Sequence, residues 1–266
     1  MGLVDSHNHL QDERLAAVRD TAIAECVRIG VRHAVVNGTH PRDWPRVAEL
    51  ADRHPWILPS YGVHPWHTDD LPSDYLVTLG RYLEKPGSVV GEIGIDHWKD
   101  GLDRGRQEEV FIAQLALARE RALPVTIHGL KAWGRLFELL QTHGAPSRGF
   151  LLHSYSGPQE MVGPFVELGG YFSICAAFFA PQRTKALELF CHIPLDRILP
   201  ETDAPDQGPS PEMDLYDVIN EGDRRVNHPG NIQMVYRGLA ELLGLTMIEV
   251  EARMEENFER IFGSSS

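Results

Sequence analysis

The sequence predicts an α/β fold, a (β/α)8 TIM barrel, which forms one domain over residues 1–263. Short β-rich runs alternate with amphipathic helical segments along the whole chain of 266 residues. Strict alternation indicates a parallel sheet with helical crossovers, and eight such units in this length match a closed barrel. The runner-up, an open doubly wound sheet, is disfavoured because no glycine-rich phosphate loop follows the first run. We expect residues 264–266 to form a disordered tail.

Eight runs are expected to form the strands, and the segments between them the helices. The expected strands are Leu3–Ser6, His33–Asn37, Ile57–Tyr61, Ser88–Glu92, Pro124–His128, Gly149–His153, Tyr171–Cys175 and Arg197–Glu201. The last two helices are expected at Ile232–Leu243 and Ile248–Ile261. One long irregular stretch remains, Ala204–Gly230, and a loop of that length in a compact domain is usually functional or mobile.

Composition limits the class of protein. Hydrophobic residues make up 42% and charged residues 24%, as in ordinary globular proteins, and the formal net charge is −13. This charge argues against a large basic surface for duplex nucleic acid. Three widely spaced cysteines indicate reduced thiols, and neither a signal peptide nor a membrane span is recognisable. We therefore expect a cytoplasmic protein with no membrane partner. The sequence indicates no particular oligomeric state.

Candidate metal ligands recur at the ends of the expected strands, where barrel enzymes carry their chemistry. The first strand ends in His7 and His9, which project to the same side because side chains along a strand alternate. Six such residues follow five strands: His7, His9, Glu92, His128, His153 and Asp203. Four imidazoles with two carboxylates are too many for one tetrahedral zinc ion and suit two divalent ions with open positions.

The neighbouring acidic residues allow more than one role. Glu92 is expected to face the barrel axis, where an unpaired charge would be costly. Asp203 suits either a helix N-cap or a metal ligand, and the other ligands favour metal. Asp5 either orients a ligand histidine or pairs within the barrel floor. Asp96 is expected to stabilise the loop after the fourth strand, and Glu201 to support the site at most.

Other residues of the same rim are candidates for substrate contact. His64 ends the third strand and is not needed to fill the metal shells, so it is a candidate for general acid–base catalysis. Trp66 and Trp98 lie in rim loops and either stack on a planar group or simply pack. A basic rim is available from Lys99, Arg104, Arg106, Lys131, Arg135, Arg224 and Arg225.

These motifs, in this order, resemble the TatD family of metal-dependent hydrolases, within the amidohydrolase-like barrels. The matching pieces cover nearly the whole chain and include Asp5-Ser6-His7-Asn8-His9-Leu10, Gly62-Val63-His64-Pro65, Gly91-Glu92-Ile93-Gly94-Ile95-Asp96, Pro124-Val125-Thr126-Ile127-His128, His153-Ser154-Tyr155-Ser156-Gly157 and Glu201-Thr202-Asp203-Ala204-Pro205. The resemblance implies a deoxyribonuclease-like phosphodiesterase. It places His7, His9 and Asp203 on one metal, His128 and His153 on the other, and Glu92 between them.

The chain departs from the family pattern in three places. Family members usually carry His-Ser-Arg after the fifth strand, where this chain has His128-Gly129-Leu130 and so lacks a phosphate contact. Trp66 follows Pro65 where the family more often has histidine. The region between Asp203 and Asn227 looks longer than usual. These departures leave DNA open as the substrate, beside a small phosphoester, an amide or a lactone.

The expected function is a binuclear metal-dependent hydrolase of the TatD type, with two divalent ions (Zn, Mn or Mg) and a metal-bridging hydroxide as nucleophile. Asp203 is expected to orient the attacking water and accept its proton. His64 or a bound water would protonate the leaving group. A scaffold merely stabilised by metal is the non-enzymatic alternative, which a closed, fully protein-ligated shell would favour.

Overall fold

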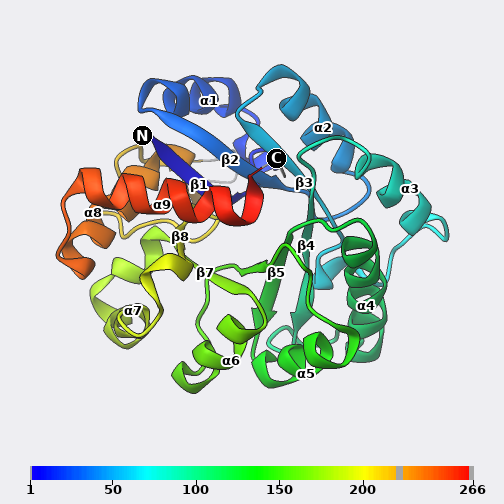
Figure 1. The fold of residues 1–266 in the computed structure, drawn as a ribbon. Helices are drawn as coiled ribbons and strands as arrows, with labels where there is room; N and C mark the ends of the chain where they lie inside the picture. The colour runs from blue at the N-terminus through cyan, green and yellow to red at the C-terminus, as the bar shows by residue number, and fades with distance from the viewer. Residues whose placement is uncertain (1, 220–223, 264–266) are drawn as a thin grey trace.

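The computed structural model, which describes residues 2–219 and 224–263, confirms the barrel. Eight parallel strands pair in chain order, and the helices that connect them surround the sheet (Figure 1). The strands are β1 (Leu3–Asn8), β2 (Val31–Asn37), β3 (Ile57–Tyr61), β4 (Val89–Asp96), β5 (Val125–Leu130), β6 (Phe150–Leu152), β7 (Gly170–Ile174) and β8 (Ile198–Pro200). The helices are α1 (Arg19–Arg28), α2 (Trp44–Arg53), α3 (Tyr75–Tyr82), α4 (Arg104–Glu120), α5 (Trp133–His143), α6 (Val162–Glu167), α7 (Thr184–Phe190), α8 (Ile232–Leu243) and α9 (Met247–Phe262).

Hydrogen bonds between β8 and β1 bring the ends of the sheet together. The Ser6 hydroxyl donates to the carbonyl of Pro200 at 2.9 Å, and the Asp203 N–H donates to the carbonyl of His7 at 2.9 Å. The first and last strands therefore meet, and their carboxyl ends lie side by side at one mouth of the barrel.

Asp5 pairs at the carboxyl ends of β1 and β8, next to the candidate ligands, and not within the barrel floor. Its carboxylate accepts from the Thr202 hydroxyl at 2.6 Å, the Thr202 N–H at 3.0 Å and the Asn8 amide at 3.1 Å. Burial raises the pKa of Asp5 to about 7, although these hydrogen bonds oppose the rise. Asp5 thus ties the residues that precede Asp203 to the strand that carries His7.

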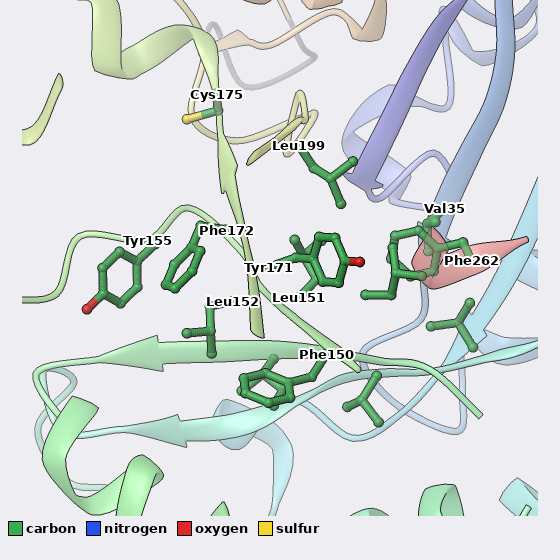
Figure 2. Packing of buried hydrophobic residues seen from close by; sticks show 14 of the residues in the cluster. Val35, Phe150, Leu151, Leu152, Tyr155, Tyr171, Phe172, Cys175, Leu199 and Phe262 are labelled. Carbon is green, nitrogen blue, oxygen red and sulfur yellow. The ribbon is translucent and has the colours of Figure 1, made fainter. Parts of the chain in front are cut away.

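The core is formed by apolar side chains of the strands and by the inner faces of the helices. Figure 2 shows part of it, where Phe150, Leu151 and Leu152 of β6 lie close to Phe172 of β7, all fully buried. Tyr155 meets Phe172 edge to face, with ring centroids 4.9 Å apart. Phe150 and Tyr155 also meet Phe165 of α6 edge to face, so this part of the core lies between the sheet and the helices around it.

Helix α9 packs at the mouth opposite to the candidate ligands. His33, near the start of β2, stacks on Phe258 of α9 with ring centroids 5.7 Å apart. The Asn257 amide donates to the carbonyls of Leu195 and Ile198 at the start of β8. This capping leaves the carboxyl-terminal mouth for ligands.

Most expected strands agree with the structure to within two residues at each end, and two regions differ more. Strand β4 continues to Asp96, four residues beyond its expected end, with a shift of register against β5 between Val90 and Ile93. The stretch 204–230 is not wholly irregular, because Val218–Ile219 (β9) and Arg225–Val226 (β10) pair as an antiparallel hairpin. The tail at 264–266 lies outside the described residues.

Candidate metal centre

The fold brings all six predicted ligands to one buried cluster at the carboxyl ends of the strands. His7 and His9 come from the end of β1, and Glu92 from β4. His128 lies in β5, His153 directly follows β6, and Asp203 follows β8. They adjoin a cavity of about 580 Å³ that five of them line, His7 being buried beneath it.

Glu92 lies at the centre of the cluster, and its two oxygens face different histidines. Oε2 lies 3.5 Å from His7 Nε2 and 3.4 Å from His9 Nε2. Oε1 lies 3.1 Å from His128 Nδ1 and 2.9 Å from His153 Nε2. One carboxylate therefore separates two groups of nitrogen donors.

Asp203 joins the group on the β1 side. Its Oδ1 lies 3.4 Å from His9 Nε2 and 3.6 Å from His7 Nε2, and these two nitrogens are 3.3 Å apart. The backbone of Asp203 has a φ of +53°, a left-handed conformation that is uncommon outside glycine and asparagine. No helix of the described chain begins at Asp203, so the N-cap alternative does not apply.

The two groups of donors are in direct contact. The rings of His7 and His153 stack with centroids 4.1 Å apart, and His128 Nδ1 lies 3.2 Å from His153 Nε2. Ligand atoms of His7, His153 and Asp203 also lie within 4.8 Å of one another, as do those of His7, His9 and Glu92. The cluster is therefore continuous, and Glu92 contacts donors on both of its sides.

His9 and His128 each make a hydrogen bond to a group outside the cluster, and this bond determines which ring nitrogen faces the cluster. His9 Nδ1 donates to the backbone carbonyl of Asn37 at 2.7 Å, because a carbonyl can only accept. His128 Nε2 donates to Asp96 Oδ2 at 3.0 Å. In the neutral rings the lone pair is then on His9 Nε2 and on His128 Nδ1, both of which face Glu92, as a metal ligand requires.

His64 has the opposite arrangement. Its Nδ1 accepts a hydrogen bond from the Trp66 backbone N–H at 3.1 Å, which leaves the proton of the neutral ring on Nε2. That nitrogen lies 3.5 Å from Glu92 Oε1. Burial lowers the pKa of His64 well below its ordinary value. The residue therefore presents an N–H donor, and no lone pair, to the cluster.

The charges of the cluster favour cations. Burial alone would lower the pKa of His9, but the hydrogen bond with Asp203 and the charge of Glu92 raise it to about 10. Burial likewise opposes protonation of His153, and Glu92 raises its pKa to about 9. Imidazoles and carboxylates are also the donors that divalent zinc, manganese and iron accept. The residues therefore fit metal ions, which would supply the positive charge that the carboxylates attract.

Asp96 has a larger part than expected. Besides His128, its Oδ2 accepts from the Trp66 indole Nε1 at 2.7 Å, and Oδ1 accepts from the backbone N–H groups of Trp98 and Lys99. Burial raises the pKa of Asp96, but the bonds from His128 and Trp66 outweigh it and leave the pKa below its usual range. Glu92 and Asp96 are four residues apart in β4, so side chains that alternate along a strand would place them on the same face. The sequence could have indicated this contact if β4 had been expected to extend to Asp96.

Asn37 could not have been identified from the sequence, since its contribution to His9 is a backbone carbonyl that any residue carries. Glu201 supports the site as expected. Its carboxylate accepts from the Ser154 hydroxyl at 2.6 Å and lies 3.9 Å from His153 Nδ1. Leu130, where the resembling family carries arginine, lines the cavity.

Comparison with known proteins agrees with this geometry. The sequence model of TatD related DNases matches residues 4–263. The chain belongs to the TatD family. It is 29% identical over 261 residues to the uncharacterized metal-dependent hydrolase YabD of Bacillus subtilis, covering 98% of both chains. It is 30% identical over 262 residues to the 3'-5' ssDNA/RNA exonuclease TatD of Erwinia tasmaniensis, covering 96% of this chain and 97% of the other.

Solved structures confirm the fold of this TatD-family chain. The structure of YjjV, a TatD homologue from Escherichia coli, superposes with a TM-score of 0.87 at 25% identity, covering 99% of this chain and 98% of that one. A phosphotriesterase homology protein from Escherichia coli shares the fold, with a TM-score of 0.67 at 14% identity. The chain is thus a metal-dependent hydrolase by family. Among the described residues, no helix is both long and apolar enough to cross a bilayer.

Proposed function

We propose that this chain is a binuclear metal-dependent phosphodiesterase that hydrolyses DNA. The observation that carries the proposal is the position of Glu92, whose two oxygens face separate donor groups. His7, His9 and Asp203 would hold one ion, His128 and His153 the other, and Glu92 would bridge them. The nitrogen-rich donor set favours zinc or manganese over magnesium. Such ions lower the pKa of water towards neutrality and stabilise charge on a phosphoryl oxygen.

The protein's own residues would assist the proton transfers. Asp203, at the edge of the donor group from β1, orients the attacking water and accepts its proton. The Nε2–H of His64 would donate a hydrogen bond to the leaving oxygen, and water in the site would supply the proton, because a neutral imidazole does not release its only N–H proton near neutral pH. Burial lowers the pKa of His64 and so keeps the ring neutral, as this hydrogen-bonding role requires.

The nucleic-acid substrate is supported by the family model, by the exonuclease name of the relative from Erwinia tasmaniensis, and by the cavity over the cluster. Leu130 supports a second candidate, a small phosphoester, amide or lactone, because it places an apolar side chain in the cavity where the family carries a phosphate-binding arginine.

The test is one panel of substrates with the purified protein, its metal content measured first. Single-stranded DNA, duplex DNA, a simple phosphodiester, a phosphomonoester and a lactone are each assayed with added manganese, zinc or magnesium. We expect hydrolysis of DNA and of the phosphodiester. Turnover of the lactone or monoester alone would contradict the nuclease proposal and support the second candidate.

A further inference from the structure

Two exposed tryptophans line the cavity over the cluster. Trp66 is 39% exposed and Trp98 is 53% exposed, and both contribute to the cavity wall beside His64 and His128. Indole rings left in water beside a buried polar site are unusual, because burial of an aromatic ring is strongly favourable. Nothing in the fold requires Trp98 to be apolar at this position, so a ligand is the natural partner for its ring.

One carboxylate contacts both tryptophans, at the indole of Trp66 and at the backbone of Trp98. Asp96 accepts from the Trp66 indole at 2.7 Å and from the Trp98 backbone N–H at 2.7 Å, and it also accepts from His128 Nε2. The aromatic wall is therefore positioned relative to the metal cluster by a residue that contacts a predicted metal ligand. A group that stacks on the wall would be fixed relative to the reacting phosphate.

A single cation accompanies the rings. The Lys99 ammonium lies 4.3 Å from the centre of the Trp66 ring, a cation–π distance, and the Lys99 backbone N–H also donates to Asp96. An ammonium placed there can contact a phosphate adjacent to the stacked group.

The overall charge of the chain favours stacking over a large basic surface. A formal net charge of −13 disfavours binding of a polyanion mainly through lysines and arginines. Stacking of bases on aromatic rings contributes about 1–3 kcal/mol per base and is open to every base, because each has a π face. A base within a duplex has both faces covered, so only an unpaired base can use such a ring.

From these contacts we infer that Trp98, with Trp66 and Lys99, forms a subsite for an unpaired nucleobase and its phosphate at this mouth of the barrel. This inference rests on the proposed function and assigns substrate contacts to side chains that are not among the predicted metal ligands. Trp98 stacks on the base, and the Lys99 ammonium beside Trp66 contacts the neighbouring phosphate.

The test measures binding separately from turnover. Fluorescence anisotropy gives the Kd of the metal-loaded protein for a labelled thymidine octamer with hydrolysis-resistant phosphorothioate linkages, and for an abasic octamer with the same linkages. We expect the thymidine strand to bind about 5- to 100-fold more tightly. Trp98→Ala should remove this difference by weakening binding of the thymidine strand only, and Trp98→Phe should restore most of it.

Two further variants complete the design. Lys99→Gln should weaken binding of both strands and reduce the salt slope by about 0.7. Ile248→Ala, which removes an exposed apolar side chain on α9, should leave both Kd values unchanged. Equal affinity of the two strands for the unaltered protein, or an equal loss for both in Trp98→Ala, would overturn the subsite.

The outcomes separate the two proposals. Base-dependent binding without hydrolysis of any phosphodiester would support the nucleobase subsite and contradict the proposed nuclease activity. Hydrolysis of DNA together with equal affinity for the thymidine and abasic strands would support the nuclease activity and contradict the nucleobase subsite. Because Trp98 is largely exposed, its variants should keep the thermal midpoint of the unaltered protein.

Discussion

The ends of β1 and β3 present histidines to the same cluster in opposite states. His9, after β1, donates through Nδ1 to the Asn37 carbonyl and turns a lone pair inward. His64, after β3, accepts through Nδ1 from the Trp66 N–H and turns a proton inward. Both residues are buried beside Glu92. Position on the rim therefore does not determine which nitrogen a histidine turns toward the cluster. That choice follows from the hydrogen bond that the ring makes on its other side.

His128 extends the comparison to the neighbouring strand. It lies beside His64, with ring centroids 4.5 Å apart, yet the carboxylate of Asp96 gives it the character of His9. In the proposed function, two adjacent imidazoles thus take different roles, metal binding by His128 and hydrogen-bond donation by His64, because of partners that lie outside the cluster. Each prediction below tests one part of this division.

Replacing the residue that separates the donor groups should have the largest effect. Glu92→Ala should lower the metal content per chain and reduce turnover by about 10³-fold or more, because both ions would lose a ligand. Metal analysis after dialysis and a phosphodiesterase assay check this. Glu160→Ala, at an exposed glutamate, is the control. Unchanged metal occupancy in Glu92→Ala would argue against the bridge.

Asp203→Asn should separate metal binding from chemistry. The amide oxygen keeps a donor in place, while proton acceptance is lost, so metal should be retained and turnover should fall by about 10³-fold. Metal content and kcat are measured on the same preparation, with Asp69→Asn at an exposed position as control. Turnover comparable to the unaltered protein would remove Asp203 from the mechanism.

The histidine pair tests the comparison itself. His9→Ala should reduce metal content, whereas His64→Ala should keep it and lower kcat by about 10²-fold, since only a hydrogen-bond donor to the leaving group is removed. His192→Ala, at an exposed position, should do neither. If His64→Ala loses as much metal as His9→Ala, the assignment of His64 as a donor is wrong.

Asp96→Asn should have the smallest effect. An amide no longer fixes the His128 tautomer by charge, and such outer partners typically contribute about 10- to 100-fold in metal affinity. Competition with a fluorescent chelator measures that affinity, and Asp100→Asn in the same loop is the control. Unaltered affinity would show that His128 keeps its orientation without Asp96.

Much of the fold and the membership of the cluster could be predicted, because both follow from local patterns. The eight strands lie where the β-rich runs indicate, and six candidate ligands mark their carboxyl ends. The extension of β4 could not be predicted, since its register shift against β5 depends on contacts with another strand. For the same reason the sequence indicated the role of Asp96 in the loop after β4 but not its contact with His128.

The sequence by itself determined the alternation of strands and helices, the family, and which side chains stand at the ends of the strands. Only the tertiary structure decided what each of those side chains presents to the cluster. The Asn37 carbonyl, the Trp66 N–H and the Asp96 carboxylate set the inward nitrogen of His9, His64 and His128. For His9 and His128 the partner comes from a different strand, and the local spacing of residues carries no record of such contacts.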